Sequence, residues 1–239
     1  VQSVGDAVAH DLRTPLTRLR ARLERTRSQA RSVAEFHEAI DQGLIWIDQT
    51  LAMVTAVLRI GEMEDGRRRG AFARVDLGEV AAVAVEFFAP LAEEKDIDLA
   101  LSVPSGAHVI DGDRDLCFEA VSNLVDNALK FTPPGGRVRA GLQRTDDAVV
   151  VTISDTGPGL PPGERTTVFH RFYRSEAARH TPGHGLGLSL VAAIVKLHGA
   201  GVTIRDAPGG GCHVALRFPM AQAAEAQADT GRSGHNPAR

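Results

Sequence analysis

Long apolar runs are absent from this sequence of 239 residues. No stretch approaches the roughly 18 apolar residues that a membrane-spanning helix needs, and no signal peptide is recognisable. Cysteine is scarce: Cys117 and Cys212 lie far apart without the spacing of metal ligands, which favours a reducing compartment. The net charge of −3 argues neither for nor against binding to nucleic acid. Because the first residue is Val1, we expect a fragment without its N-terminal part, so the missing span says nothing about the parent protein.

Two helices with apolar seams are predicted in the early part of the chain. The first covers residues 2–30, and Pro15 should bend it. The second runs from about residue 33 to residue 58. The seams consist of Leu12, Leu16, Leu19 and Leu23 in the first helix and of Phe36, Ile40, Leu44, Ile47, Leu51, Val54 and Leu58 in the second. An antiparallel helical hairpin cannot bury both seams alone, so we predict a dimeric four-helix bundle over residues 1–60.

A linker over residues 61–71 is predicted because glycines and a run of arginines interrupt both helical patterns. Beyond it, strand-like and helix-like segments mix, which predicts an α+β layered domain over residues 72–220. The expected strands are residues 72–75, 97–103, 137–144, 148–154, 202–205 and 213–218, and the expected helices are residues 77–95, a helix that Asp113 opens, and residues 186–198. Residues 221–239 lack large apolar side chains, so we expect a disordered tail.

One predicted helix carries two amides and an ammonium group on a single face. Asn123, Asn127 and Lys130 are spaced i, i+4 and i+7, so they share one side of the helix. Another side carries Leu116, Ala120, Leu124, Ala128 and Phe131 and can pack on a sheet. Amide oxygens can ligate Mg²⁺ and a lysine can neutralise phosphate, so the polar face suits a bound polyphosphate. Taken alone, such a pattern is more often a solvated polar face.

Two glycine-rich segments follow this helix. Asp155-Thr-Gly157-Pro-Gly159 comes directly after an apolar strand pattern, and Gly183-His-Gly185-Leu186-Gly187-Leu188 leads into a helix. Glycines let the backbone approach a ligand, and N–H groups at the start of a helix can hold phosphate oxygens. The second segment does not follow the strand of a βαβ unit, which argues against a Rossmann site. Aspartic proteases also use Asp-Thr-Gly, but they need two such loops, or a dimer of them, in an all-β setting, and neither requirement fits this chain.

A histidine motif lies near the start of the chain, Ala9-His10-Asp11-Leu12-Arg13-Thr14-Pro15-Leu16. His10 falls off the apolar seam, so we expect an accessible imidazole, and its neutral ring nitrogen is a competent nucleophile near neutral pH. The adjacent Asp11 is a candidate for orienting the ring, and Thr14 lies one helical turn further along. In isolation, a histidine and an aspartate here would be an ordinary solvated pair.

Together, and in this order, these motifs resemble those of sensor histidine kinases of two-component systems. The segment Val168-Phe169-His-Arg171-Phe172-Tyr-Arg174 is similar to the phenylalanine box of that family. The resemblance extends to about residue 220 and implies a dimerisation and phosphotransfer bundle followed by an ATP-binding α/β sandwich of the GHKL (Bergerat) type. The implied reaction is ATP-dependent phosphorylation of a histidine and transfer of that phosphoryl group to an aspartate of a response regulator.

The resemblance also implies roles for single residues. His10 would be the phosphoacceptor, Asp11 would orient it, and Thr14 would position the water that dephosphorylates the regulator. Asn127 would ligate Mg²⁺ together with ATP, and Asp155 would accept a hydrogen bond from the adenine amino group. The other expected ATP-binding residues are Asn123, Lys130, Gly157, Gly159, Arg171, Arg174, Gly183, Gly185, Leu186, Gly187 and Leu188. Phe169 and Phe172 are expected to pack beneath a nucleotide lid.

Other interpretations stay open at this point. Arg171 and Arg174 could be solvated arginines rather than phosphate ligands. A non-catalytic scaffold, or a phosphatase that keeps nucleotide as a structural ligand, is the rival from another class. A general ATPase of the GHKL type is a third, but hydrolysing relatives carry a carboxylate where this chain has Asn123. Because an amide cannot act as a general base, Asn123 favours phosphoryl transfer.

The expected partners are a second copy of the chain and a receiver domain that docks on the helical bundle. The seven arginines between Arg13 and Arg31 are either a solvated surface or part of that docking face. No nucleic-acid-reading module is apparent. The resemblance implies the cytoplasmic region of an inner-membrane sensor protein, with membrane attachment only through the missing N-terminal region.

Overall fold

The computed structural model describes residues 17, 19–29, 32–64, 70, 72–171, 173–175 and 185–221. The predictions for His10, Asp11, Thr14, Gly183 and Phe172 fall outside these residues, as do those for most of the linker and for the tail. Within the described part, no helix is long and apolar enough to cross a membrane.

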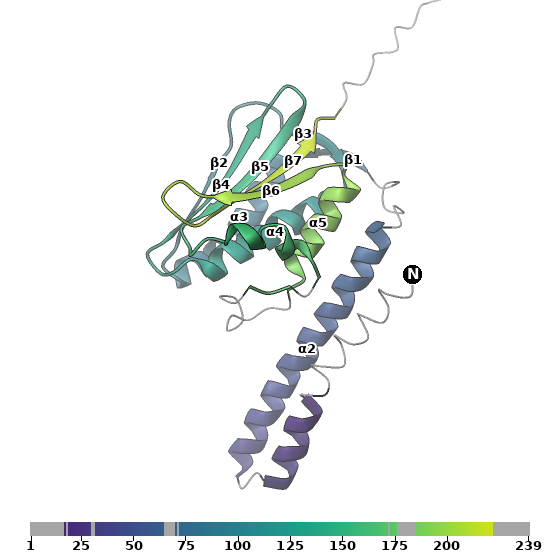
Figure 1. Cartoon of the computed structure of the whole chain (residues 1–239), viewed down its shortest axis with the longest axis vertical. Helices are drawn as coiled ribbons and strands as arrows, with labels where there is room; N and C mark the ends of the chain where they lie inside the picture. Colours follow the sequence, from purple (N-terminus) through teal and green to yellow (C-terminus); the bar gives the residue numbers. More distant parts are fainter. Residues whose placement is uncertain are drawn as a thin grey trace, which may run out of the picture.

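The described residues of the early part of the chain form part of the predicted helical hairpin (Figure 1). Residues 19–29 are helical and run alongside α2 (Val33–Glu64). The two helices approach closely at Gly43, where a β-carbon would lie 3.3 Å from Leu19 Cδ1. The glycine therefore allows the tight packing of this hairpin.

Helix α2 ends at Glu64 rather than near Leu58, so it runs into the segment predicted as a linker. The glycine at position 61 lowers helix stability by only about 1 kcal/mol. Met63 is buried in the same apolar cluster as the core of the following domain. Tertiary burial of Met63 therefore extends the helix past the glycine, because most helix stability in proteins comes from packing.

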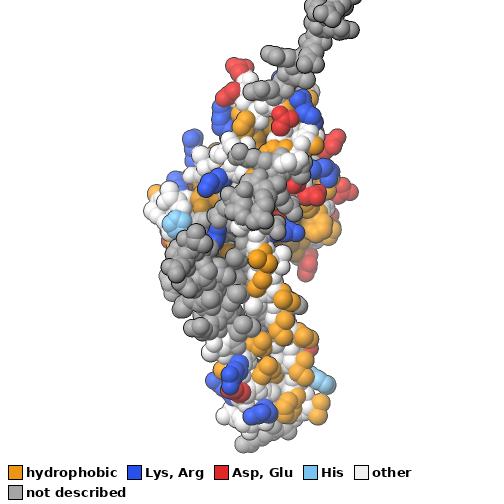
Figure 2. All heavy atoms as spheres, turned by 90° about the vertical axis from the view of Figure 1, so that its right-hand side faces the viewer, with side chains coloured by type: hydrophobic (Ala, Val, Ile, Leu, Met, Phe, Trp, Pro, Cys, Tyr) orange, Lys and Arg blue, Asp and Glu red, His pale blue; other side chains and the backbone are white. Residues whose placement is uncertain are grey.

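The predicted seam of α2 remains largely uncovered within a single chain. Its exposed members are Phe36, Ile40, Leu44, Ile47, Leu51 and Leu58, with exposed fractions between 40% and 63%. Figure 2 shows hydrophobic side chains along the length of this helix. Large apolar side chains repeated along one helix form an unusually extensive exposed apolar surface for a soluble domain.

The second domain is a mixed sheet with three helices on one face (Figure 1). Its strand order is β2-β4-β5-β7-β6; β2 pairs parallel with β4, and the other neighbours are antiparallel. The strands are β2 (Asp98–Ser102), β4 (Arg137–Arg144), β5 (Ala148–Asp155), β6 (Gly201–Asp206) and β7 (Cys212–Pro219). The helices are α3 (Leu77–Glu94), α4 (Arg114–Phe131) and α5 (Gly187–Leu197), and β1 (Ala73–Asp76) pairs antiparallel with β3 (Val109–Gly112).

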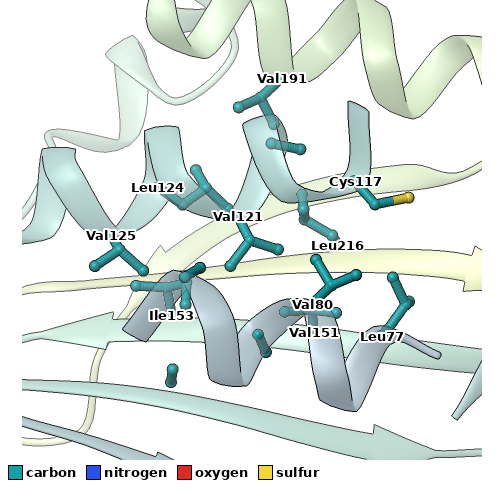
Figure 3. Close-up of a cluster of buried hydrophobic side chains, with 14 of the residues drawn as sticks. Leu77, Val80, Cys117, Val121, Leu124, Val125, Val151, Ile153, Val191 and Leu216 are labelled. Carbon is teal, nitrogen blue, oxygen red and sulfur yellow. The ribbon is translucent and has the colours of Figure 1, made fainter. Parts of the chain in front are cut away.

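The core lies between the helices and the sheet. Along β5, Val149, Val151 and Ile153 alternate with less buried residues, so one face of the strand supplies the core. In Figure 3 the side chains of Val121 and Val125 on α4 point toward the strands. This apolar layer fixes α4 against the sheet, and the polar face of α4, which carries Asn123, Asn127 and Lys130, is not part of the core.

The predicted strands and helices of the second domain are confirmed, with ends that differ by one or two residues. Two kinds of element were missed. β3 is only four residues long with an acidic residue in its centre, and the short 3-10 helices η2 (Pro162–Glu164) and η3 (Thr167–Phe169) have no periodic pattern. The N-cap of α4 is confirmed: Asp113 Oδ1 accepts bonds from Asp115 N at 3.0 Å and Leu116 N at 3.2 Å.

Asp113→Ala is expected to lower the free energy of unfolding by about 1 kcal/mol, because two N–H groups at the start of α4 lose their acceptor. Asp113→Asn keeps an acceptor oxygen and is the matched control. Chemical denaturation of both variants measures the difference. Equal stability of the alanine variant and the wild type would show that the cap contributes nothing.

Candidate nucleotide-binding site

A cavity of about 320 Å³ lies between the sheet, α4 and the start of α5. It unites three segments that are far apart in the sequence. The predicted residues that line it are Asn123, Asn127, Lys130, Asp155, Gly159, Arg174, Gly185, Leu186, Gly187 and Leu188. Gly157 and Arg171 do not line it.

The amide of Asn123 has a defined orientation. Its Nδ2 donates a 2.8 Å hydrogen bond to the carbonyl oxygen of Glu119, one turn earlier in α4. At the start of α5, a β-carbon on Gly187 would lie 2.8 Å from Asn123 Oδ1 and 3.8 Å from Asn127 Nδ2. Since real β-carbons do not approach other atoms that closely, glycine is what lets α5 begin beside the amides.

The start of α5 presents backbone N–H groups to the cavity. Leu186 is the N-cap residue and its side chain makes no capping bond. Ser189, in the first turn, donates its hydroxyl to the Leu186 carbonyl and so does not cap the helix either. Gly185 adopts a φ of +68°, which turns the preceding chain into the helix. First-turn N–H groups without intrahelical acceptors, at the positive end of the helix dipole, form a site for phosphate oxygens.

Asp155, at the end of β5, marks another side of the cavity. Its side chain is 9% exposed. Oδ1 accepts bonds from Gly157 N at 2.9 Å and Cys212 N at 3.1 Å, which leaves Oδ2 as an acceptor for a ligand. Burial raises the pKa of this carboxyl, and the two backbone bonds offset that rise only in part.

Gly157 supports the carboxylate instead of lining the cavity. A β-carbon on Gly157 would lie 2.8 Å from the carbonyl oxygen of Phe131. Gly211 is a supporting residue that the sequence analysis missed. It has a φ of +91°, and a β-carbon there would lie 2.0 Å from the Asp155 carbonyl oxygen. The signal for Gly211 was present as three consecutive glycines before β7, but spacing alone could not indicate their partner.

Most of the missed lining residues are apolar. They are Leu124, Ala128, Phe131, Ile153, Pro158, Leu160, Val168, Ile204 and Val214. In the sequence, those that lie on helices and strands are indistinguishable from core residues because they belong to the same periodic patterns, and Pro158, Leu160 and Val168 belong to no periodic pattern at all. An apolar lining around one carboxylate suits a flat heterocycle with an exocyclic amino group.

The segment that resembles the phenylalanine box lies partly at the cavity. Val168 is buried and lines it, as do Tyr173 and Arg174. Phe169 is half-buried in η3 and does not line it, in keeping with the predicted packing role. The phosphate role predicted for Arg171 and Arg174 remains a prediction.

The donor set fits a magnesium ion that arrives with a nucleotide. Among the described residues, no group of three or more His, Cys, Asp or Glu side chains could hold a metal. The Nδ2 of Asn123 is turned toward Glu119, so its amide oxygen is the free end. Mg²⁺ usually takes one or two protein oxygens and completes its shell with phosphates and water, which suits Asn127 on the same face.

Asp155→Asn is expected to weaken discrimination of ATP over GTP and to raise the melting temperature at neutral pH. Because the pKa of Asp155 is raised in the folded state, its stabilising contribution is present below the ordinary carboxyl pKa and lost as pH rises through the folded pKa. At neutral pH the asparagine amide is uncharged, so the variant avoids the free-energy cost of burying the charged carboxylate.

The same substitution also affects binding. Losing a charge-assisted bond to the adenine amino group should weaken ATP binding by about 1.5–3 kcal/mol.

Titration calorimetry with both nucleotides, and thermal unfolding at neutral and acidic pH, test this expectation. The matched control is Asp147→Asn, at the other end of β5, where hydrogen bonding by Arg217 lowers the pKa of the carboxyl. That control should show no stability gain at neutral pH and unchanged nucleotide binding. Unaltered discrimination in Asp155→Asn would rule out the adenine contact.

The cavity lies within a segment that matches a known family. Residues 112–222 match the family described as histidine kinase-, DNA gyrase B-, and HSP90-like ATPase. This range contains α4, the Asp155 segment and α5, which together form the cavity.

Longer relatives match most of the chain. It is 38% identical over 214 residues to signal transduction histidine-protein kinase/phosphatase MprB of Mycobacterium sp. (strain KMS), a match that covers 87% of the chain and 40% of the relative. The chain thus spans less than half the length of this curated relative. A solved structure of the mycobacterial sensor histidine kinase MprB is 35% identical, covers 63% of this chain and 98% of that one, and has a TM-score of 0.55.

The likeness of fold also reaches the hairpin. The Acinetobacter baumannii histidine kinase AdeS, at 20% identity, covers 88% of this chain and 98% of that chain with a TM-score of 0.67. The matched 88% of this chain is more than the second domain alone contains, so the match includes part of the hairpin. With its GHKL-type α/β domain behind a helical hairpin, the chain belongs to the sensor histidine kinase family.

Proposed function

We propose that this chain uses Mg²⁺ and ATP to phosphorylate His10 and passes the phosphoryl group to an aspartate in the receiver domain of a response regulator. The observation that carries the proposal is the meeting of the α4 amides, the start of α5 and Asp155 at one cavity. His10 lies outside the described residues, so its role rests on the resemblance of its motif to the family's phosphoacceptor box.

The adenine ring lies against Asp155 in this proposal. The free Oδ2 accepts a bond from the exocyclic amino group, and Oδ1 stays on the N–H groups of Gly157 and Cys212. Apolar residues such as Leu124 and Ile153 contact the faces of the ring. Guanine presents a carbonyl oxygen at the equivalent position, which a carboxylate repels.

The phosphates lie at the start of α5, beside the amides of α4. Backbone N–H groups of Gly187 and Leu188 donate to phosphate oxygens. Asn127 supplies an oxygen to Mg²⁺, while Asn123 and Lys130 contact phosphate or metal. Arg174 lines the cavity and is better positioned than Arg171 to neutralise the transferred group.

Phosphoryl transfer is favoured over hydrolysis by the chemistry at position 123. An amide whose Nδ2 is already bonded to a carbonyl oxygen offers a ligand oxygen but no group that can take a proton from water. The attacking group must therefore come from elsewhere, and the neutral imidazole of His10 supplies it, with Asp11 orienting the ring. In-line attack needs the γ-phosphate close to His10, so the second domain moves relative to the hairpin during the cycle.

Dephosphorylation of the regulator is the second proposed activity, favoured by the kinase/phosphatase name of the mycobacterial relative. Thr14, four residues after His10 in the sequence, would position the water. The receiver domain docks on the helical bundle near the arginine-rich first helix. ATP and receiver domains are intracellular reactants, so the proposed reaction belongs in the cytoplasm.

His10→Gln is expected to abolish phosphorylation from γ-labelled ATP while leaving nucleotide affinity nearly unchanged, because the described residues that line the cavity all lie between positions 123 and 214. His37→Gln, at an exposed position on α2, is the matched control and should label normally. Acid-labile label that persists in the His10 variant would assign the phosphoacceptor elsewhere.

A homodimer through residues 1–60 is proposed because most of the described side chains on the apolar face of α2 are exposed. Leu44, 55% exposed in the centre of that face, is the sensitive position. Leu44→Glu should shift the chain from dimer to monomer in light scattering, because a charge would be buried at the interface. Phe87→Glu on α3, at a side chain 68% exposed outside the seam, is the control and should stay dimeric. A wild-type monomer would contradict the proposal.

A further inference from the structure

A second carboxylate lines the cavity beside the proposed phosphate positions. Asp126 lies on α4 between the two amide residues and forms an ion pair with Lys130 Nζ, one turn further along the helix. The side chains of Lys130 and Asp126 are 33% and 29% exposed, so water screens the pair less than it screens a surface pair. Within the described lining, Asp126 and Asp155 are the only acidic residues.

The negative charge of the Asp126 carboxylate is unfavourable in a site that binds a polyphosphate. Asp155 has a separate explanation, because its Oδ1 is fixed by two backbone bonds and its Oδ2 faces a ligand. Asp126 accepts from no backbone donor among the described residues; its partner there is Lys130. Before nucleotide binds, the lysine charge is therefore already neutralised, and an incoming phosphate must compete with a carboxylate for it.

We propose that Asp126 makes the site select metal-complexed nucleotide over metal-free nucleotide. Without a metal, the phosphates repel Asp126 and must draw Lys130 away from it. When Mg²⁺ accompanies the nucleotide, the cation would cancel part of the phosphate charge, so the repulsion by Asp126 would be smaller. The penalty that Asp126 imposes therefore falls mainly on the metal-free form. This inference rests on the proposed nucleotide function of the cavity.

Two simpler roles for Asp126 give different results in binding experiments. If Asp126 were a direct ligand of Mg²⁺, removing its charge would weaken binding of the magnesium complex. If the ion pair were only an i,i+4 contact that supports the helix, its loss would change stability slightly and leave both affinities unchanged.

Titration calorimetry on the full chain tests the inference, with ATP in excess Mg²⁺ and ATP in EDTA as the two ligands. Asp126→Asn keeps the shape of the side chain and removes its charge. Binding of metal-free ATP should become about fivefold tighter, and binding of Mg²⁺–ATP should change by less than about twofold. Asp146→Asn, in the exposed turn between β4 and β5, removes the same charge away from the cavity and should change neither affinity.

Each other outcome overturns the proposal. Weaker Mg²⁺–ATP binding with unchanged metal-free binding would make Asp126 a metal ligand. Unchanged affinities for metal-free ATP and Mg²⁺–ATP would show that the ion pair only supports the helix. Equal tightening of binding in Asp126→Asn and Asp146→Asn would show that the effect comes from the net charge of the chain. If the wild-type chain bound neither form, the proposed function itself would fail, and this result is distinct from the others.

Discussion

The site depends on how closely the start of α5 approaches the polar face of α4. At Gly187 a β-carbon would lie 2.8 Å from Asn123 Oδ1, so the contact between the two helices leaves no room for a side chain at this position. This contact brings the N–H groups of α5 beside the side-chain amides of Asn123 and Asn127 on α4. The far ends of the same helices are joined by His198, whose Nε2 accepts from Asp113 N at 3.0 Å while its Nδ1 donates to Ile194 O at 2.8 Å. The separation of α4 and α5 is thus fixed at both ends.

In the proposed complex, the two ends of the nucleotide would be held by different kinds of interaction. The phosphates would contact helix N–H groups, the amides of α4 and Lys130, which is paired with Asp126, whereas the adenine ring would contact the buried carboxylate of Asp155. Outside this rigid domain, α2 packs on α5 and its Arg59 forms a 2.6 Å ion pair with Glu119 on α4. Such a partly exposed pair contributes little stability. The ion pair therefore opposes a movement of the hairpin only weakly, whereas Met63 ties the end of α2 to the core of the second domain.

Local spacing predicted much of this arrangement. The stripe of Asn123 and Asn127 on one helix face, and the Asp113 cap, follow from residues a few positions apart. Contacts between distant segments did not follow, because no local pattern shows that Gly211 packs on Asp155. The predicted end of α2 was wrong for a related reason. The sequence shows the glycine at position 61, but it does not show the core that buries Met63 two residues later. The resemblance to a known family supplied the roles that spacing could not.

A crystal structure of the chain with Mg²⁺ and a non-hydrolysable ATP analogue tests the central claim most directly. The account predicts the adenine amino group within hydrogen-bonding distance of Asp155 Oδ2. It also predicts phosphate oxygens on the N–H groups that begin α5 and the metal on Asn127 Oδ1. Nucleotide bound elsewhere, or bound here with its phosphates away from the start of α5, would contradict the account.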